Sequence, residues 1–138
     1  MVVIRTIQDG PEITLVHVYL QCDTGVELAN VTLLDPALLA GYQPGNRLEV
    51  QDLMYDFMGF DAAIFFGTGL PTNAGIWVLP EGSGSGKRNF RPWGNLRDWS
   101  GLDGTGRLLI TTTGFTSVED QGTLLLRVRK NVYPIVPV

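Results

Sequence analysis

The sequence predicts an all-β fold: an antiparallel β-sandwich of the jelly-roll type with about eight strands. Most of the chain consists of short alternating or wholly apolar runs, which turn residues separate at intervals of about 8–15 residues. The 17 glycines and eight prolines argue against a helical bundle, because both residue types interrupt helices. Helical and strand patterns do not alternate, so a parallel nucleotide-binding sheet is not expected.

The length and composition predict one domain over residues 1–138. The chain has 138 residues, of which 44% are hydrophobic and 17% charged. This is enough apolar surface to form a core without metals or disulfides, and it excludes global disorder. No run reaches the ~18 consecutive apolar residues of a membrane-spanning helix, so no membrane partner is expected.

Three strands are expected in the first 34 residues. The first covers Val2–Ile7 and stops at the turn Asp9-Gly10-Pro11. The second covers Ile13–Cys22, and its two largely apolar faces are typical of a central strand. A weaker third strand covers Val26–Leu34 and is interrupted by Ala29-Asn30.

Residues 35–41 carry the one helical signal of the chain. Asp35 is a suitable N-cap, Pro36 suits the first helical position, and Gly41 suits the residue after the end. A single short helical turn is therefore expected here.

Three strands follow this turn. The first alternates over Arg47–Phe57 and is expected to end at Gly59. Leu48, Val50 and Met54 are placed on one face with Asp52 and Asp56, and Leu53, Tyr55 and Phe57 on the other. Two short apolar strands are expected at Ala62–Phe66 and Ile76–Leu79.

Residues 80–106 are predicted to form a long loop. Its first part, 81–86, has the alternating glycine and serine of a flexible linker. Its second part is aromatic and is expected to pack over one end or edge of the fold. The aromatic and apolar residues of this second part are Phe90, Trp93, Leu96 and Trp99.

The last two strands are expected at Arg107–Thr113 and Thr123–Lys130. In the second of these, Leu124, Leu126 and Val128 share one face, and Leu125, Arg127 and Arg129 share the other. Residues 131–138 form an extended tail without charged side chains, in which two prolines prevent a regular central strand.

The residues of common catalytic and metal sites are scarce, so no enzyme, cofactor or metal is expected. His17 and Cys22 are the only residues of their types, and they point to opposite faces of one strand. The run Gly82–Arg88 lacks the spacing and the Ser/Thr of a phosphate-binding loop. Asp52 and Asp56 lie about 13 Å apart along a strand, farther than the carboxylates of a glycosidase.

The charge is negative overall but unevenly distributed. The net charge is −4, with −7 on residues 1–80 and +3 on residues 81–138. Binding to nucleic acid is not expected, because it requires a positive surface. The uneven charge has two interpretations: it could steer one surface toward an oppositely charged neighbour, or it could be a solvated surface on which the charges segregate by chance.

The aromatic part of the loop has two interpretations. Trp93 and Trp99, flanked by Arg91 and Arg97, could form a sugar-stacking platform or a protein hot spot. They could also form a small cluster that folds the loop onto the sandwich, which is the interpretation that the sequence favours.

Several segments resemble small virion structural proteins of tailed bacteriophages, some of which are capsid decoration (cement) proteins. The resemblance covers residues 1–10 and 80–130. The segments that carry it are Arg5–Gly10, Gly86–Arg91, Trp93–Gly94, Gly101–Gly104, Gly106–Gly114 and Asp120–Lys130.

This resemblance implies a non-enzymatic protein, made in the host cytoplasm, that sits on the capsid surface. Its implied partners are the major capsid protein and further copies of itself, in a homotrimer. The uncharged tail is expected to dock on a neighbour. The predicted interaction residues are Trp93, Arg97, Trp99, Val132, Tyr133, Ile135 and Val136. The alternatives are a carbohydrate- or receptor-binding module of a tail spike or fibre, and an enzyme with Asp52, Asp56 or Asp98 beside Arg97 in a deep pocket.

Overall fold

The computed structural model describes all residues except 24, 43–45, 69–76, 99–103 and 133–138. The described residues form an antiparallel all-β fold, which confirms the predicted fold class. The elements are β1 (Val2–Asp9), β2 (Ile13–Gln21), β3 (Val31–Leu34), η1 (Pro36–Leu38), β4 (Arg47–Thr68), β5 (Trp77–Asn89), η2 (Arg91–Trp93), β6 (Leu96–Arg97), β7 (Gly104–Thr113) and β8 (Gln121–Val132). The jelly-roll connectivity stays a prediction.

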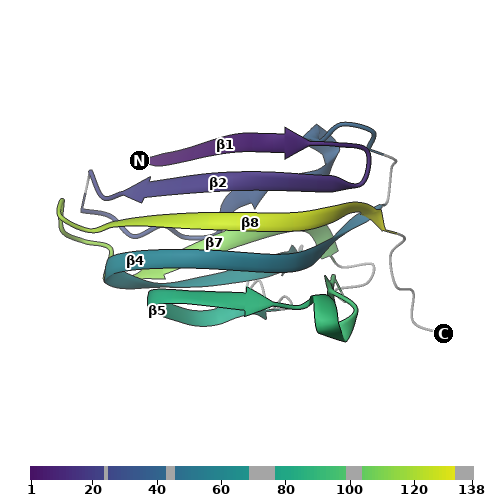
Figure 1. The fold of residues 1–138 in the computed structure, drawn as a ribbon. Coiled ribbons are helices and arrows are strands. Elements are labelled where there is room, and N and C mark those ends of the chain that lie inside the picture. The colour runs from purple at the N-terminus through teal and green to yellow at the C-terminus, as the bar shows by residue number, and fades with distance from the viewer. Residues whose placement is uncertain (24, 43–45, 69–76, 99–103, 133–138) are drawn as a thin grey trace.

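The strands form two layers that share β4 and β5. The first half of β4 pairs with β8, which continues the layer through β2 to β1 at its edge. The second half of β4 pairs with β7, which continues the other layer to β3. β5 pairs with both halves of β4. Figure 1 shows the first layer in front, from β1 at the top to β5 at the bottom, and β7 behind it.

The core lies between the two layers and comes from strict alternation along the strands. In β8, Leu124, Leu126 and Val128 are fully buried, as the sequence predicts. Their neighbours on β2, Val16 and Val18, are fully buried as well. The core is therefore closed by side chains that the period-two pattern identifies.

β4 bends between the two layers at Gly59. Gly59 has φ +88°, and a Cβ atom there would overlap the carboxylate of Asp120. A strand can change direction at such a glycine without ending. The prediction that the strand ends at Gly59 is therefore wrong: the runs Arg47–Phe57 and Ala62–Phe66 belong to one strand.

The predicted faces of β4 are also corrected. The register with β8 shifts between Val50 and Asp52, as at a β-bulge. An extra residue in a strand reverses the alternation of the side chains that follow. Leu48 and Val50 are therefore buried in the core together with Leu53, whereas Met54 is exposed.

The glycine-rich segment expected to be a flexible linker belongs to β5. The prediction of a loop over 80–106 is therefore wrong up to Asn89, and also at Leu96–Arg97 (β6) and from Gly104, where β7 begins. Gly86 lies opposite Tyr55 in β4, and a Cβ atom on Gly86 would lie 2.6 Å from Cζ of Tyr55. The tyrosine ring covers the glycine, so the strand is formed although the glycine has no side chain to pack. The Tyr55 ring also stacks on Phe57, with 5.1 Å between the ring centroids.

The aromatic row continues to Phe60, and Gly122 of β8 supplies the room for it. A Cβ atom on Gly122 would lie 2.8 Å from Phe57 Cδ1 and 2.9 Å from Phe60 Cζ. We expect Gly122→Ala to lower the free energy of unfolding by about 1–3 kcal/mol, because it overpacks the core. Chemical denaturation measures this. Gly10→Ala is the control, because its Cβ would lie 3.5 Å from the nearest atom; equal losses would contradict the packing argument.

The segment before β4 differs from its prediction in one place. Asn30 has φ +51°, which interrupts the extended backbone, so β3 covers only Val31–Leu34. The helical turn that follows is confirmed as η1. It has Pro36 at its start, and its cap Asp35 accepts a hydrogen bond of 3.1 Å from the backbone N–H of Ala37.

Candidate interaction surface

The predicted interaction residue Trp93 lies on a tight turn after β5. The backbone N–H of Phe90 donates to the carbonyl of Gln51 at 2.8 Å, and the N–H of Asn95 donates to the carbonyl of Phe90 at 2.9 Å. Gly94 and Asn95 both have left-handed backbone conformations, with φ of +82° and +69°. These bonds close residues 90–95 into one turn that is fixed to β4.

Side chains of β4 also bind this turn. The buried carboxylate of Glu49 accepts hydrogen bonds from Asn95 Nδ2 at 3.0 Å and from Arg97 Nε at 3.1 Å. Asp52 pairs with Arg91 at 2.6 Å. The turn, which we call the Trp93 turn (residues 90–97), is therefore attached to β4 through both backbone and side chains.

Trp93 itself is 85% exposed. The expectation that this aromatic segment packs onto the sandwich is correct for Phe90 and Leu96, which lie against the core. It is wrong for Trp93, because the hydrogen bonds of the turn direct this residue away from the fold. An almost fully exposed tryptophan on a fixed turn is typical of a contact residue.

The other predicted interaction residues are less informative. Arg97 is bound to Glu49, so it has a structural partner within the chain. Val132 is the last residue of β8 and lies opposite Arg47. Trp99, Tyr133, Ile135 and Val136 lie outside the described residues. Trp93 is therefore the predicted residue that the structure makes available to a partner.

The sequence did not predict a shallow groove on the outer face of the first layer, which contains β1, β2, β8, β4 and β5. It follows one row of residues across the strands, in the order Arg5, His17, Leu125, Met54 and Lys87. The main hollow has a volume of about 410 Å³, and a second hollow of about 400 Å³ shares its His17 wall. Met54 is 47% exposed there.

The lining of this groove combines apolar and charged side chains. Its floor is apolar, from Leu125 and Met54, and cationic side chains lie at its ends. Asp56, on one wall, accepts a hydrogen bond of 3.0 Å from Ser85 Oγ. The row becomes visible only once the register is known, although the outward positions of each strand follow from alternation.

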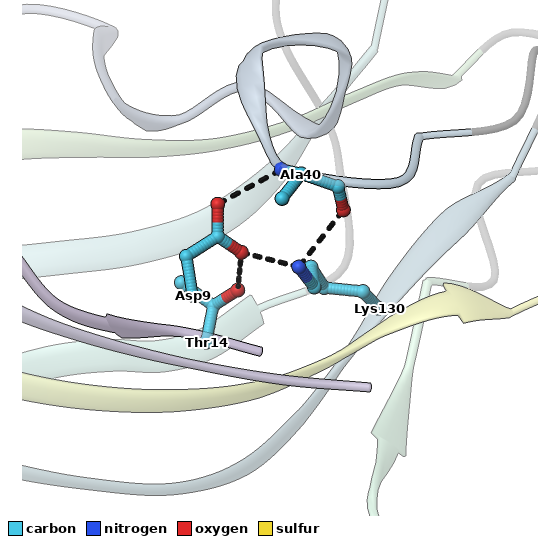
Figure 2. Close-up of polar contacts among 4 residues, drawn as sticks. All are labelled: Asp9, Thr14, Ala40 and Lys130. Atoms are coloured by element: carbon cyan, nitrogen blue, oxygen red, sulfur yellow. Dashed lines mark hydrogen bonds and ion pairs between the residues drawn. The ribbon is translucent and has the colours of Figure 1, made fainter. Parts of the chain in front are cut away.

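A charged pair with one buried member, Lys130, lies where β1, β2, β8 and the residues after η1 meet (Figure 2). The Lys130 side chain is 2% exposed; its ammonium group pairs with Asp9 and donates to the carbonyl of Ala40 at 2.9 Å. Asp9 also accepts from the backbone N–H of Ala40 at 2.8 Å and from Thr14 Oγ1 at 3.0 Å. This Asp9–Lys130 clamp ties four segments together.

The protonation of the clamp is set by these contacts. Burial raises the pKa of Asp9, but hydrogen bonds from Lys130, Ala40 and Thr14 and the attraction of the lysine charge outweigh it. The net result holds the pKa of Asp9 below its ordinary value of 3.8. Asp9 and Lys130 therefore form an ion pair whose hydrogen bonds lie within the protein.

Other chemistries find little support among the described residues. They contain no group of three or more His, Cys, Asp or Glu side chains that could hold a metal ion. No described helix is long and apolar enough to cross a membrane. Asp98 is buried and pairs with Arg47 at 3.4 Å, while Arg97 pairs with Glu49, so the arrangement proposed for an enzyme is not formed by these residues.

Searches against protein families, curated proteins and solved structures find no match to this chain.

Proposed function

We propose that this chain is a non-enzymatic structural protein of a tailed-phage virion: a capsid decoration protein that binds the shell formed by the major capsid protein. The observation that carries the proposal is the exposure of Trp93 on the Trp93 turn. The resemblance of residues 1–10 and 80–130 to virion structural proteins gives the identity of the partner. Such a role needs a rigid body and contact surfaces, and no cofactor.

The construction of the Trp93 turn supports a binding role. Glu49 and Asp52 hold the turn in place before any partner arrives, so little conformational freedom is lost on binding. A tryptophan that enters a pocket of a partner can contribute about 2 kcal/mol or more to the binding free energy, as hot-spot residues do. The uneven charge adds long-range attraction to an acidic surface.

The proposal is tested with empty shells assembled from the major capsid protein encoded in the same genome. We expect the wild-type chain to sediment with the shells and Trp93→Ala to bind at least about tenfold more weakly, because a hot-spot side chain is lost. The melting temperature is expected to stay unchanged, because Trp93 has few contacts within the chain.

Val118→Ala is the matched control, because Val118 is also apolar and 68% exposed but lies in a different turn. Equal weakening by both variants, or no binding by the wild type, would contradict the proposal. Light scattering of the free chain in the same samples tests the homotrimer that we propose with it.

The alternative is a carbohydrate- or receptor-binding module of a tail spike or fibre. The same exposure of Trp93 favours it, because an exposed indole ring also stacks on sugars. A glycan array separates the two proposals: glycan binding that Trp93→Ala removes, without any binding to shells, would favour the alternative.

A further inference from the structure

The free edge of β1 presents backbone groups in a defined pattern. Among the described strands, β1 pairs only with β2. At its start, the N–H of Gln21 donates to the carbonyl of Met1 at 2.9 Å, and the Met1 amino group donates to the carbonyl of Gln21 at 2.6 Å. Bonded and non-bonded pairs alternate in antiparallel strands. Val2, Ile4 and Thr6 therefore direct their N–H and C=O groups away from β2.

The side chains of these three residues face the inner side of the layer. Ile4 lies opposite Val18, which is fully buried in the core. Ile4 itself is nevertheless 40% exposed. The edge thus combines free backbone groups with an apolar side chain that one further strand would cover.

The edge has few of the features by which edge strands usually avoid pairing with another chain, such as prolines, charged side chains and β-bulges. Residues 2–6 contain no proline and one charged residue, Arg5. The β-bulge of β1 lies between Thr6 and Gln8, beyond this segment. An ion pair of 2.9 Å between the Met1 amino group and Asp23 fixes the start of the strand. Residues 2–6 are therefore in regular β conformation, and their outward backbone groups can pair with a further strand.

We propose that β1 is a homotypic interface, where β1 of a second copy pairs antiparallel across a two-fold axis at Ile4. Pairing must join residues that direct their backbone groups outward. An axis at Arg5 would place two arginines opposite each other, which is unfavourable. An axis at Val3 would leave Thr6 without a bonded partner. An axis at Ile4 pairs Ile4 with itself, Val2 with Thr6 and Thr6 with Val2.

The proposed contact has two physical consequences. The first layers of the two copies become one continuous sheet, held by about six backbone hydrogen bonds. The two Ile4 side chains cover each other on the inner side, and each Arg5 lies opposite Val3 of the second copy. The contact is independent of the proposed function, which uses Trp93. Because its axis is two-fold, it would join copies from different trimers in a trimeric assembly.

Cysteine cross-linking tests the register. In the proposed pair, the Cα atoms of the two residues at position 4 lie about 5.5 Å apart, within disulfide range. We expect Ile4→Cys to give a disulfide-linked dimer under mild oxidation. Thr6→Cys is the control, because the two residues at position 6 would lie about 13 Å apart. The wild type serves as the control for the buried Cys22. Equal cross-linking at both positions, or none at position 4, would overturn the register.

A proline variant tests the interface itself. The N–H of Ile4 points away from β2, so Ile4→Pro removes no hydrogen bond within the chain. Because both copies carry the proline, it removes both hydrogen bonds of the Ile4–Ile4 pair across the interface. We expect light scattering to show an even number of copies for the wild type and half that number for Ile4→Pro. Circular dichroism checks that the variant is folded. A wild-type monomer, or a mass that Ile4→Pro leaves unchanged in a folded protein, would overturn the proposal. If Ile4→Pro does not fold, the cross-linking comparison decides.

Discussion

Replacing Asp9 with alanine is expected to lower the free energy of unfolding by about 1.5–3 kcal/mol, because the buried ammonium group of Lys130 loses its charged hydrogen-bond partner. The Lys130 side chain is 2% exposed, so its charge would stay buried with the Ala40 carbonyl as its remaining partner shown in Figure 2. Urea denaturation followed by tryptophan fluorescence measures the loss.

The double variant Asp9→Ala/Lys130→Met separates the charge from the packing. Methionine fills most of the lysine volume without a charge, so we expect the double variant to regain most of the stability that Asp9→Ala loses. If the double variant is as unstable as Asp9→Ala alone, the contribution of Asp9 comes from its bonds to Ala40 and Thr14 rather than from its pairing with Lys130.

The same clamp gives the protein an acid-sensitive contribution to stability. The pKa of Asp9 in the folded protein lies below the ordinary value of 3.8. The stability contributed by its carboxylate is therefore fully present above that value, and it is lost as the pH falls through the lower folded-state pKa. Asp9→Asn is expected to show less loss of stability than the wild type as the pH is lowered from neutral to below 3.8. Parallel curves for the two proteins would contradict this assignment.

Gly59→Ala is the second change for which we expect a large effect, about 2–5 kcal/mol. A side chain at φ +88° costs about 1–2 kcal/mol. The new Cβ atom would also displace the carboxylate of Asp120, which accepts hydrogen bonds of 3.0 Å from the backbone N–H groups of Thr116 and Ser117. The N–H of Thr116 also donates to the carbonyl of Gly114 at 3.0 Å, so it is the N–H of Ser117 that loses its acceptor, which adds about 1–3 kcal/mol.

Gly94→Ala is the matched control for this substitution. Gly94 has φ +82°, close to that of Gly59, but no atom lies within 4 Å of its Cβ position. We therefore expect Gly94→Ala to lose only the backbone contribution, about 1–2 kcal/mol. Thermal and chemical denaturation of both variants give the comparison. Equal losses would show that the contact with Asp120 contributes nothing.

The sequence predicted the fold class and most strands because their signals are local. Alternation in β2 and β8 and the cap of η1 need only neighbouring residues to be recognised. The errors concern pairing between distant segments. Residues 82–86 have the composition of a linker, and they form a strand because Tyr55 covers Gly86 from the adjacent strand. The bulge after Val50 is a property of the register with β8, which composition does not reveal.

The interaction surface was predicted in part for the same reason. The aromatic composition of the segment identified Trp93 as a candidate. The exposure of Trp93, however, depends on the hydrogen bond between Asn95 and Glu49, which lie 46 residues apart in sequence. The groove around His17 and Met54 needs residues from β1, β2, β4, β5 and β8 in one row. Such a row is set by the strand order, and the order is decided by the whole fold.

The passage of β4 through both layers gives the protein a mechanical property. A tensile load on one layer reaches the other through the peptide bonds of β4, rather than only through side chains packed between them. The two layers therefore cannot slide apart under force unless hydrogen bonds along β4 break. A protein that decorates a capsid shell, the role proposed for this chain, would benefit from such covalent continuity when the shell is under load.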